Sequence, residues 1–374
     1  MNVREIKLPK TINKGMPPLE VSDNATSFFE FWPAWVMYTP VIFQWFILSA
    51  KYRSIGLPLI ANPGIHLSGM VGESKADILS LATEQSAKSI CSFTSFIRND
   101  QTTPEDDAKA VLKDYLGKGL ALPAVIKPNL GCRGFGVRLI DTEEQLVDYL
   151  ESFPIGASFI LQEKSVYQAE AGIFYIRYPG QKKGKVISLT LKYTPWVIGD
   201  GKHTLKELIL ADSRAGKLSH IYLDRHADNL DTILDDGEEY RLAFAGSHTF
   251  GSIFKNGNKY ITNELSESLD RFFDGVPGYN FGRLDVKFKD IDTLMRGEDY
   301  QVLEMNGASS EATHIWDSRT TLKEAMSTLL YQYKVLFEIG HLERKAGHKV
   351  PSLLSLYKAW KEEKRWLQNY PSTD

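Results

Sequence analysis

The chain has 374 residues, enough for two or three lobes around a large buried core, and its formal net charge is −3. Charged residues of both signs are mixed along the sequence, and no basic stripe indicates a nucleic-acid partner. The two cysteines, Cys91 and Cys132, lie far apart and outside any metal-binding spacing. They argue against a disulfide framework and favour a reducing compartment.

Residues 31–50, FWPAWVMYTPVIFQWFILSA, form a run without charged residues. A helix of this length would be about as long as a membrane is thick. Pro33 and Pro40 disfavour a straight spanning helix, and the polar first 30 residues do not resemble a signal peptide. Three interpretations stay open. The run is a broken helical element packed on the core, an interfacial anchor with its tryptophans at headgroup depth, or a wall of a groove for an apolar substrate.

The next stretch is expected to contain a strand-like run followed by a helix. Residues 57–61 are strand-like, and Ser74 is expected to cap a helix that runs to about Ala82. The helix start at residues 72–75 is either a plain cap or a place for an anionic substrate.

A glycine-rich hairpin is predicted further along. Residues 124–126 read as a strand that ends at Lys127, and residues 137–140 read as the following strand. Three glycines lie in the loop between these strands, Gly131, Gly134 and Gly136. Glycines let backbone N–H groups approach a phosphate closely, although an ordinary turn is the alternative. The loop leads into a strand and lacks Gly-Lys-Ser/Thr, so it is neither a P-loop nor a Rossmann fingerprint.

Two further segments are expected to contain strands that carry site residues. Residues 159–163 read as a buried strand that ends at Glu163, and residues 173–178 read as the next strand. Such a hinge suits adenine, because backbone groups can bind the edge of the base and a carboxylate can bind its amino group or the ribose. A later strand contains Lys192 and precedes a glycine turn and a helix capped near Thr204.

Two polar clusters near the C-terminal third carry the clearest chemical signal. Arg283 and Asp285 lie in YNFGRLDVKF, and Glu304 and Asn306 lie in YQVLEMNGASSE. Polar and apolar residues alternate in both, so paired strands would bring the four side chains to one face. Two carboxylates and an amide oxygen are ligands that Mg²⁺ takes, and an adjacent arginine can hold phosphoryl oxygens. Taken alone, Asp-Val-Lys is more typical of a solvated edge strand.

These four segments, in this order, resemble the ATP-grasp superfamily of carboxylate–amine ligases over about residues 122–320. GRLDV…LEMN is most like the D-alanine–D-alanine ligase branch, and VIGDGKHTLKELI looks like the cyanophycin synthetase and bifunctional glutathione synthetase branch. The resemblance implies an α/β fold with α+β lobes, the nucleotide lying between two of them, a helix-rich N-terminal region and C-terminal helices. The expected divisions are an apolar or substrate lobe (1–88), a small ATP-grasp lobe (89–162), a large lobe with the metal site (163–335) and a helical extension (336–374).

The resemblance also implies roles in binding ATP. Lys127 and Lys192 would contact the phosphates from opposite lobes, and the loop 131–136 would cover them. Glu163 would sit by the adenine and Glu170 by the ribose. The loop departs from the family pattern at residues 132 and 133, Cys and Arg, where a small residue is common.

For the reacting centre, the resemblance implies that Arg283, with Lys192, stabilises the transferred phosphoryl group. Asp285, Glu304 and Asn306 would hold one or two Mg²⁺ ions, with Mn²⁺ as an alternative. Replacing Asp285 or Glu304 is expected to reduce turnover by orders of magnitude while leaving thermal stability nearly unchanged.

The implied reaction joins two small molecules. ATP would activate a carboxylate as an acyl phosphate, which an amine or hydroxyl attacks with release of ADP and phosphate. The alternatives are an ATP-grasp kinase that does not ligate, and a non-catalytic nucleotide-binding protein. We expect a cytoplasmic enzyme, with peripheral contact to the inner membrane face through residues 31–50 and homo-oligomerisation left open. Substrate specificity is expected near residues 226–252, where His248 either faces the substrate or packs the loop.

Overall fold

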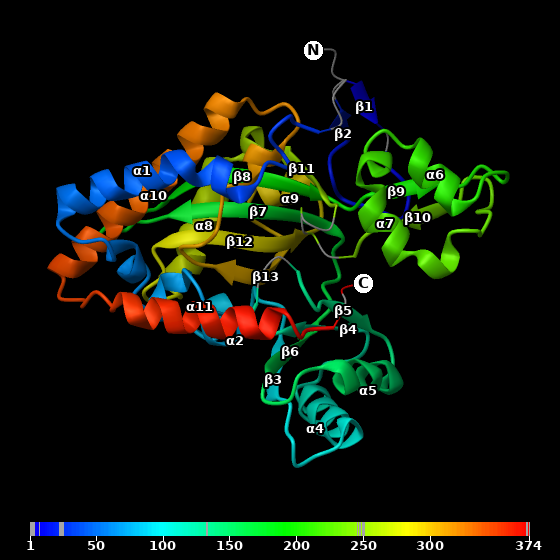
Figure 1. The fold of residues 1–374 in the computed structure, drawn as a ribbon, viewed down its shortest axis with the longest axis horizontal. Coiled ribbons are helices and arrows are strands. Elements are labelled where there is room, and N and C mark those ends of the chain that lie inside the picture. The colour runs from blue at the N-terminus through cyan, green and yellow to red at the C-terminus, as the bar shows by residue number, and fades with distance from the viewer. Residues whose placement is uncertain are drawn as a thin grey trace.

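The computed structural model describes residues 4–6, 8–21, 26–131, 134–244, 246, 248, 251–371 and 373 (Figure 1). Two antiparallel sheets form the framework of the fold. One has five strands in the order β11-β8-β7-β12-β13, and the other has four in the order β3-β6-β4-β5. The mixed α and β class predicted from the sequence is confirmed.

The strands of the larger sheet are β7 (Ala169–Ile176), β8 (Lys185–Tyr193), β11 (Ile253–Asn256), β12 (Phe281–Phe288) and β13 (Tyr300–Asn306). Those of the smaller sheet are β3 (Phe93–Ile97), β4 (Ala124–Pro128), β5 (Arg138–Ile140) and β6 (Ser158–Glu163). Two short pairs join β1 (Arg4–Ile6) to β2 (Leu19–Val21) and β9 (Trp196–Ile198) to β10 (Glu239–Arg241).

The helices before residue 200 are α1 (Ala34–Tyr52), α2 (Lys75–Leu79), α3 (Glu84–Ala87), α4 (Pro104–Gly117) and α5 (Glu143–Ser152). Those after it are α6 (Leu205–Ala211), α7 (Ser219–Arg225), α8 (Asn263–Asp274), α9 (Ile291–Met295), α10 (Leu322–Lys345) and α11 (Leu353–Leu367). Thr204 caps α6, which agrees with the cap expected near that residue, and Thr142 caps α5 by accepting a hydrogen bond from Gln145 N.

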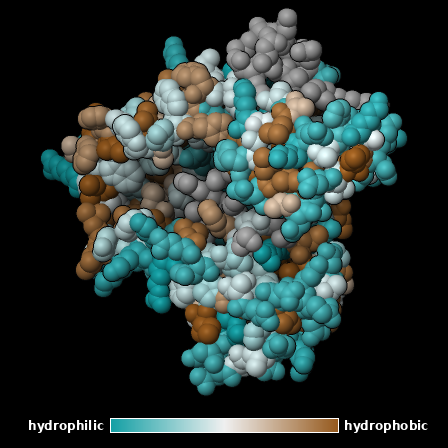
Figure 2. All heavy atoms as spheres, turned by 45° about the vertical axis from the view of Figure 1, so that its right-hand side comes forward, coloured by the Kyte–Doolittle hydropathy of each residue, from teal (hydrophilic) through white to brown (hydrophobic). Residues whose placement is uncertain are grey.

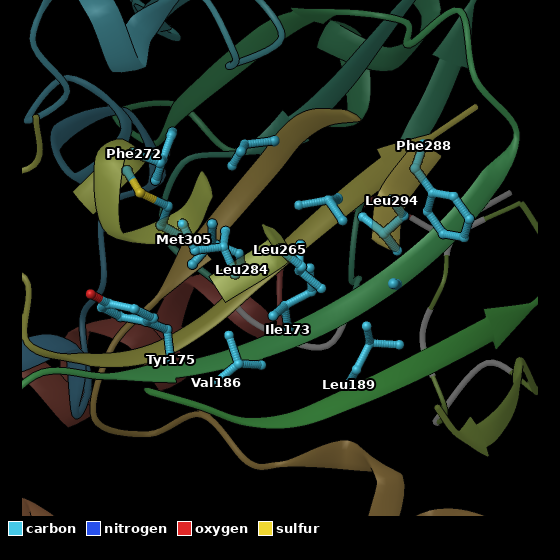
Figure 3. Close-up of a cluster of buried hydrophobic side chains, with 14 of the residues drawn as sticks. Ile173, Tyr175, Val186, Leu189, Leu265, Phe272, Leu284, Phe288, Leu294 and Met305 are labelled. Carbon is cyan, nitrogen blue, oxygen red and sulfur yellow. The ribbon is translucent and has the colours of Figure 1, made fainter. Parts of the chain in front are cut away.

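The main hydrophobic core lies between the five-stranded sheet and α8 (Figure 3). Every residue of the central strand β7 is buried. Apolar residues recur along α8 at three- and four-residue spacing and pack on the sheet, namely Leu265, Leu269, Phe272 and Phe273. Burying a side chain of this size contributes about 1.5–3 kcal/mol. This layer therefore holds β7 and β12 firmly in place, and both strands carry predicted site residues.

The smaller sheet has its own core, formed with α4 and α5. Residues from both helices, such as Val111 and Leu146, are fully buried beside Leu161 of β6. The two sheets are therefore supported by separate apolar layers.

Residues 34–60 are mainly helical and pack on α10. Residues 57–61, predicted as a strand, instead form a 3₁₀ helix (η1, Leu57–Ile60) buried against α10, and α2 ends at Leu79 instead of near Ala82. Residues 26–92, all of which the structure describes, contain no strand, so this part of the N-terminal region is helix-rich, as the resemblance implied.

The charge-free run forms α1, and it is not broken as the first interpretation expected. Pro33 lies at the N-cap, while Pro40 lies within a helix that continues to Tyr52. A proline removes one backbone hydrogen bond, but here Met37 and Val41 on either side of it are buried against α10. Tertiary packing therefore holds the helix through the proline. Among the described residues, no helix is long and apolar enough to span a membrane.

Gly340 offers a test of the α10 packing. A Cβ at Gly340 would overlap the carbonyl oxygen of Leu57 in η1, a backbone atom that cannot simply rotate away. Alanine favours a helix over glycine by about 1 kcal/mol, but the overlap should outweigh this gain, so Gly340→Ala is expected to destabilise the protein by about 1–3 kcal/mol. Urea unfolding measures the change. Gly117→Ala in α4, where a Cβ meets open space, is the control and should be neutral or stabilising.

Candidate functional site

A cavity of about 1150 Å³ is lined by residues from both sheets and from the start of α1. Ten of the eleven candidate residues predicted from the sequence lie on its wall, namely Lys127, Gly131, Gly134, Glu163, Glu170, Lys192, Arg283, Asp285, Glu304 and Asn306. The exception is Gly136, which is buried. A Cβ there would lie 2.8 Å from Cγ of Pro128, and its φ of +69° suits glycine, so this residue forms the turn.

The pairing of β12 with β13 brings the two polar clusters together. Asp285 lies opposite Glu304, and Arg283 lies opposite Asn306. β12 is an inner strand between β7 and β13, so the solvated edge-strand alternative does not apply. The four side chains therefore share one face of the sheet, as their alternation predicted.

A β-bulge lies next to this group. The register shifts after Asp285, so that Leu303 of β13 is an extra residue between two paired positions. Its carbonyl oxygen accepts hydrogen bonds from Lys127 Nζ at 3.2 Å and from Gln162 Nε2 at 3.3 Å. Both donors belong to the four-stranded sheet, so the bulge is a point at which the two sheets are linked beside the site.

Asp285 is the centre of a buried ion cluster. Its Oδ1 lies 2.9 Å from Arg283 Nε and 2.8 Å from Lys192 Nζ, and its Oδ2 accepts from Asn306 Nδ2 at 3.3 Å. Burial opposes ionisation, but Arg283 and Lys192 outweigh it and hold the pKa of Asp285 below its usual range. The aspartate is therefore ionised at neutral pH and neutralises the two cations predicted to bind phosphate.

Glu170 forms a second ion cluster beside the first. Its Oε1 lies 3.3 Å from Lys192 Nζ, and its Oε2 lies 2.8 Å from Nζ of Lys287, the residue opposite it on β12. Burial opposes ionisation of Glu170, but Lys287 and Lys192 outweigh it and lower its pKa. Lys192 thus bridges Glu170 and Asp285. Lys287, which looked like part of a solvated strand in the sequence, lines the cavity.

The opposite wall belongs to the four-stranded sheet and its loop. Burial lowers the pKa of Lys127, with Glu304 opposing that shift. Glu163 ends β6 and accepts a hydrogen bond from Ser92 N at 3.2 Å. Gly131 and Gly134 border the cavity. Residues 132 and 133, where the loop departs from the family pattern, lie outside the described residues.

The helix start at residues 72–75 also reaches the cavity, a placement that sequence alone left open. Lys75 Nζ donates to the carbonyl oxygen of Gly131 at 2.6 Å and lies 3.5 Å from Glu304 Oε1. Glu73 Oε1 accepts from Gly307 N at 2.8 Å, and burial raises the pKa of Glu73 to about 8. Ser74 caps α2 by accepting a hydrogen bond from Asp77 N, as the plain-cap interpretation expects, and the substrate interpretation stays a prediction.

Glu311 and Trp316 also line the cavity and were not predicted from the sequence. Glu311 lies five residues after Asn306, and Trp316 Nε1 donates to its Oε2 at 3.1 Å. Burial raises the pKa of Glu311 to about 7. Its backbone carbonyl accepts from Arg283 Nη1 at 3.2 Å, which places this loop beside the predicted phosphoryl site.

Glu30 is a buried carboxylate contributed by the N-terminal segment. It pairs with Arg214 Nη2 at 2.7 Å and with His248 Nε2 at 2.8 Å. The His248 ring stacks on Phe31 and on Trp316, with centroids 5.9 and 5.5 Å apart. His248 therefore both lines the cavity and packs its loop, and the contacts link the N-terminal segment to the predicted specificity region. These contacts join residues that lie far apart in the sequence, so local sequence patterns do not predict them.

The donor chemistry of the predicted metal group fits Mg²⁺. The ion commonly takes one or two carboxylates and completes its octahedron with water and substrate phosphates. Asp285 and Glu304 supply carboxylates facing the cavity, and Asn306 supplies an amide. Among the described residues no cluster of three or more His, Cys, Asp or Glu side chains is arranged to bind a metal.

Comparison with known proteins adds the following findings. No protein-family model matches the sequence. The chain is 30% identical over 155 residues to a cyanophycin synthetase of Crocosphaera subtropica, an alignment that covers 36% of this chain and 17% of that protein. The chain thus spans well under two thirds of the length of that relative.

Among solved structures, the chain is similar to the D-alanine–D-alanine ligase from Bacillus anthracis, with a TM-score of 0.44 and 13% identity over 76% of this chain and 72% of that one. It is also similar to the bifunctional glutathione synthetase from Pasteurella multocida, with a TM-score of 0.34 and 14% identity over 69% and 36% of the two chains. The names of these proteins include those of the branches that the motifs resembled.

The burial of Asp285 changes the expectation that its replacement leaves thermal stability nearly unchanged. Its side chain is 9% exposed between two cations, whereas that of Glu304 is 26% exposed and has one ion pair at 3.5 Å. Asp285→Asn should therefore destabilise the protein by about 3 kcal/mol or more, because it leaves buried positive charge unpaired. Glu304→Gln should change stability by less than about 0.5 kcal/mol. Chemical unfolding at pH 7 measures both, and equal stability of the two variants would contradict the cluster.

Proposed function

We propose that the protein is an ATP-dependent ligase that activates a small-molecule carboxylate as an acyl phosphate and joins it to an amine or hydroxyl. The observation that carries the proposal is the convergence of cations from both sheets on one cavity that also holds paired carboxylates. Lys127 comes from β4, while Lys192 and Arg283 come from β8 and β12, beside Asp285 and Glu304. Cations and metal-binding carboxylates on facing walls suit the polyphosphate of ATP.

The nucleotide would lie between the two sheets. Its phosphates carry several negative charges, and the cavity is lined by seven basic side chains besides its histidines, namely Lys75, Lys127, Lys164, Lys192, Lys287, Arg241 and Arg283. Backbone groups of the glycine loop would approach the phosphates closely. The adenine would lie towards the end of β6, with Glu163 beside it, and Glu170 would lie towards the ribose.

Mg²⁺ would be held by Asp285, Glu304 and Asn306, with Mn²⁺ able to take the same ligands. When bound, the metal neutralises charge on the phosphoryl oxygens. The cations now paired with Asp285 would then turn to the phosphates. Arg283 is suited to the transferred phosphoryl group, because its planar guanidinium presents several N–H donors at fixed angles.

The chemistry then needs two displacements. A carboxylate oxygen of the substrate attacks the γ-phosphorus, the bond to the bridging oxygen breaks, and ADP leaves. The amine then attacks the acyl carbon, inorganic phosphate leaves with the former carboxylate oxygen, and the nitrogen loses a proton. The residues of this chain mainly position the reactants and stabilise phosphoryl charge, which is where the largest rate effects arise in such reactions.

Glu311 is the candidate group for taking the proton from the amine. It lines the cavity on the loop that Arg283 contacts, and its pKa of about 7 matches the operating pH of a general base. Glu73, with a pKa of about 8, also lines the cavity, where Gly307 N donates a hydrogen bond to it. These two carboxyl groups mark the end of the cavity at which the second substrate would react.

Hydroxylamine trapping tests the acyl phosphate directly. The protein is incubated with ATP, Mg²⁺ and pools of carboxylic acids, and hydroxylamine converts an acyl phosphate to a hydroxamate that mass spectrometry identifies. Hydroxamate and ADP should form in equal amounts. Glu304→Gln should lower the rate at least about 100-fold. Glu298→Gln, which removes an exposed carboxylate outside the cavity, should leave it unchanged.

Two results would overturn the ligase proposal. A stable phosphorylated product that hydroxylamine does not trap would favour the kinase alternative. ATP binding without ADP release for any carboxylate pool would favour the non-catalytic nucleotide-binding alternative.

The lysine assignments make a separate prediction about ATP. Lys127→Ala and Lys192→Ala should each weaken ATP binding about tenfold or more, because each removes a cation from one wall of the phosphate site. Isothermal titration calorimetry with Mg²⁺ and ATP measures the dissociation constant. Lys206→Ala on the exposed surface of α6 is the matched control, and unchanged affinity in both cavity variants would remove these lysines from the phosphate site.

A further inference from the structure

One face of α1 exposes a continuous apolar stripe. Its residues are Trp35, Ile42, Phe43, Phe46 and Ile47, each between 50% and 72% exposed. They recur at spacings of three, four and seven residues, which places them on one side of the helix. Figure 2 shows hydrophobic residues gathered on the left-hand side of the molecule, the side on which Figure 1 places α1.

The stripe does not belong to the packing of α1 within the fold. The opposite side of the helix supplies Met37, Val41 and Leu48, which are buried against α10 and η1. Proteins rarely leave a large contiguous apolar surface in water unless another surface covers it. The whole run 31–50 carries no charge, and Thr39, which lies between Trp35 and Phe43 on this face, donates its hydroxyl to the carbonyl oxygen of Trp35 within the helix.

The stripe continues to the mouth of the cavity. Phe31 and Trp32 precede α1, line the cavity and are 55% and 36% exposed. Phe28, 70% exposed, packs edge-on against Trp32 with ring centroids 5.4 Å apart. The aromatic rim therefore adds exposed apolar side chains directly before the first residue of the stripe, Trp35, in sequence.

A basic cluster lies at the other end of the helix. Lys51 and Arg53 are exposed at the C-terminus of α1. The end of α10 lies against this point, because Arg344 Nη2 donates to the carbonyl oxygen of Tyr52 at 2.9 Å. The exposed Lys345 and Lys349 follow Arg344 closely in sequence. Positive charge thus borders the apolar stripe.

We propose that the α1 stripe docks on an anionic lipid bilayer, with the helix lying in the plane of the interface. The stripe and the aromatic rim enter the boundary between headgroups and acyl chains, where tryptophan is favoured. The basic cluster contacts anionic headgroups, each cation contributing through short-range attraction that salt screens. The proposal goes beyond the ligase reaction and does not depend on it.

A second copy of the chain fits this surface less well than a bilayer does. It would present the same face, and residues 31–53 contain no acidic residue that could pair with the basic cluster. An anionic bilayer offers both components, an apolar layer for the stripe and negative charge for the cluster. The mouth of the cavity would then lie at the membrane surface.

Vesicle co-sedimentation without ATP tests the docking. The full chain should bind vesicles of phosphatidylcholine with phosphatidylglycerol, and should bind less to pure phosphatidylcholine or at high salt. The double variant Phe43→Glu with Ile47→Glu should lower the bound fraction at least about tenfold, because each change removes an apolar side chain worth more than 1.4 kcal/mol when buried. Neither residue lines the cavity, so ATP binding should be unchanged.

Two matched controls locate the contact. Leu116→Glu replaces an equally exposed apolar residue on α4 and should leave binding unchanged. Vesicles with brominated acyl chains should quench tryptophan fluorescence, and Trp35→Phe should reduce that quenching while Trp196→Phe should not. No binding of the wild-type chain to anionic vesicles would overturn the proposal. So would a dimer in solution that the double variant dissociates while vesicles bind neither form.

Discussion

The structure of the candidate site depends on a compact group of opposite charges held on one sheet. Asp285 and Glu170 share Lys192 between them, Arg283 holds Asp285 from one side and Lys287 holds Glu170 from the other. Isolated charges in such a buried position would be costly, so each is stable only while its partners remain in place. The arrangement in turn requires β7, β8 and β12 to keep their register, which the core beneath the sheet secures.

The four-stranded sheet and the N-terminal segment complete the site from the other side. The bulge at Leu303 receives Lys127 and Gln162, and Lys75 connects Glu304 to the glycine loop. Each sheet has its own apolar core, but other contacts also join the two sheets. Cys91 N donates to the carbonyl oxygen of Val302 in β13, and Phe93 of β3 packs against the core of the larger sheet. The polar contacts beside the cavity are therefore one part of the connection between its two walls.

Much of the site could be predicted from local patterns. The alternation around Asp285 and Glu304 identified both the strands and the shared face, and the register of β12 with β13 agrees. Glu30, Glu73 and Glu311 were harder, because their placement depends on contacts between distant segments or on a loop with no periodic pattern. Lys287 was misleading for a different reason: a lysine on a strand is usually solvated, and here Glu170 on the neighbouring strand keeps it in the site.

The N-terminal fold shows the same limit. Proline propensity predicted a broken helix over residues 31–50, but burial of Met37 and Val41 against α10 carries α1 through Pro40. The strand-like composition of residues 57–61 likewise gave way to packing, since η1 is buried against the same helix. Local propensity predicted the positions of these elements along the chain. It did not predict their conformation, because tertiary contacts selected a different one.

The pairing of Lys192 and Arg283 with Asp285 also determines how the site would respond to ionic strength. An open basic pocket attracts small anions from solution, and a ligand must displace them, so affinity falls steeply with added salt. Here the counter-ion is a side chain fixed within the protein, and under the proposed function a phosphate would arrive with its metal and bring both signs of charge. The exchange of partners would then take place largely within the cavity, and added salt would change the affinity little.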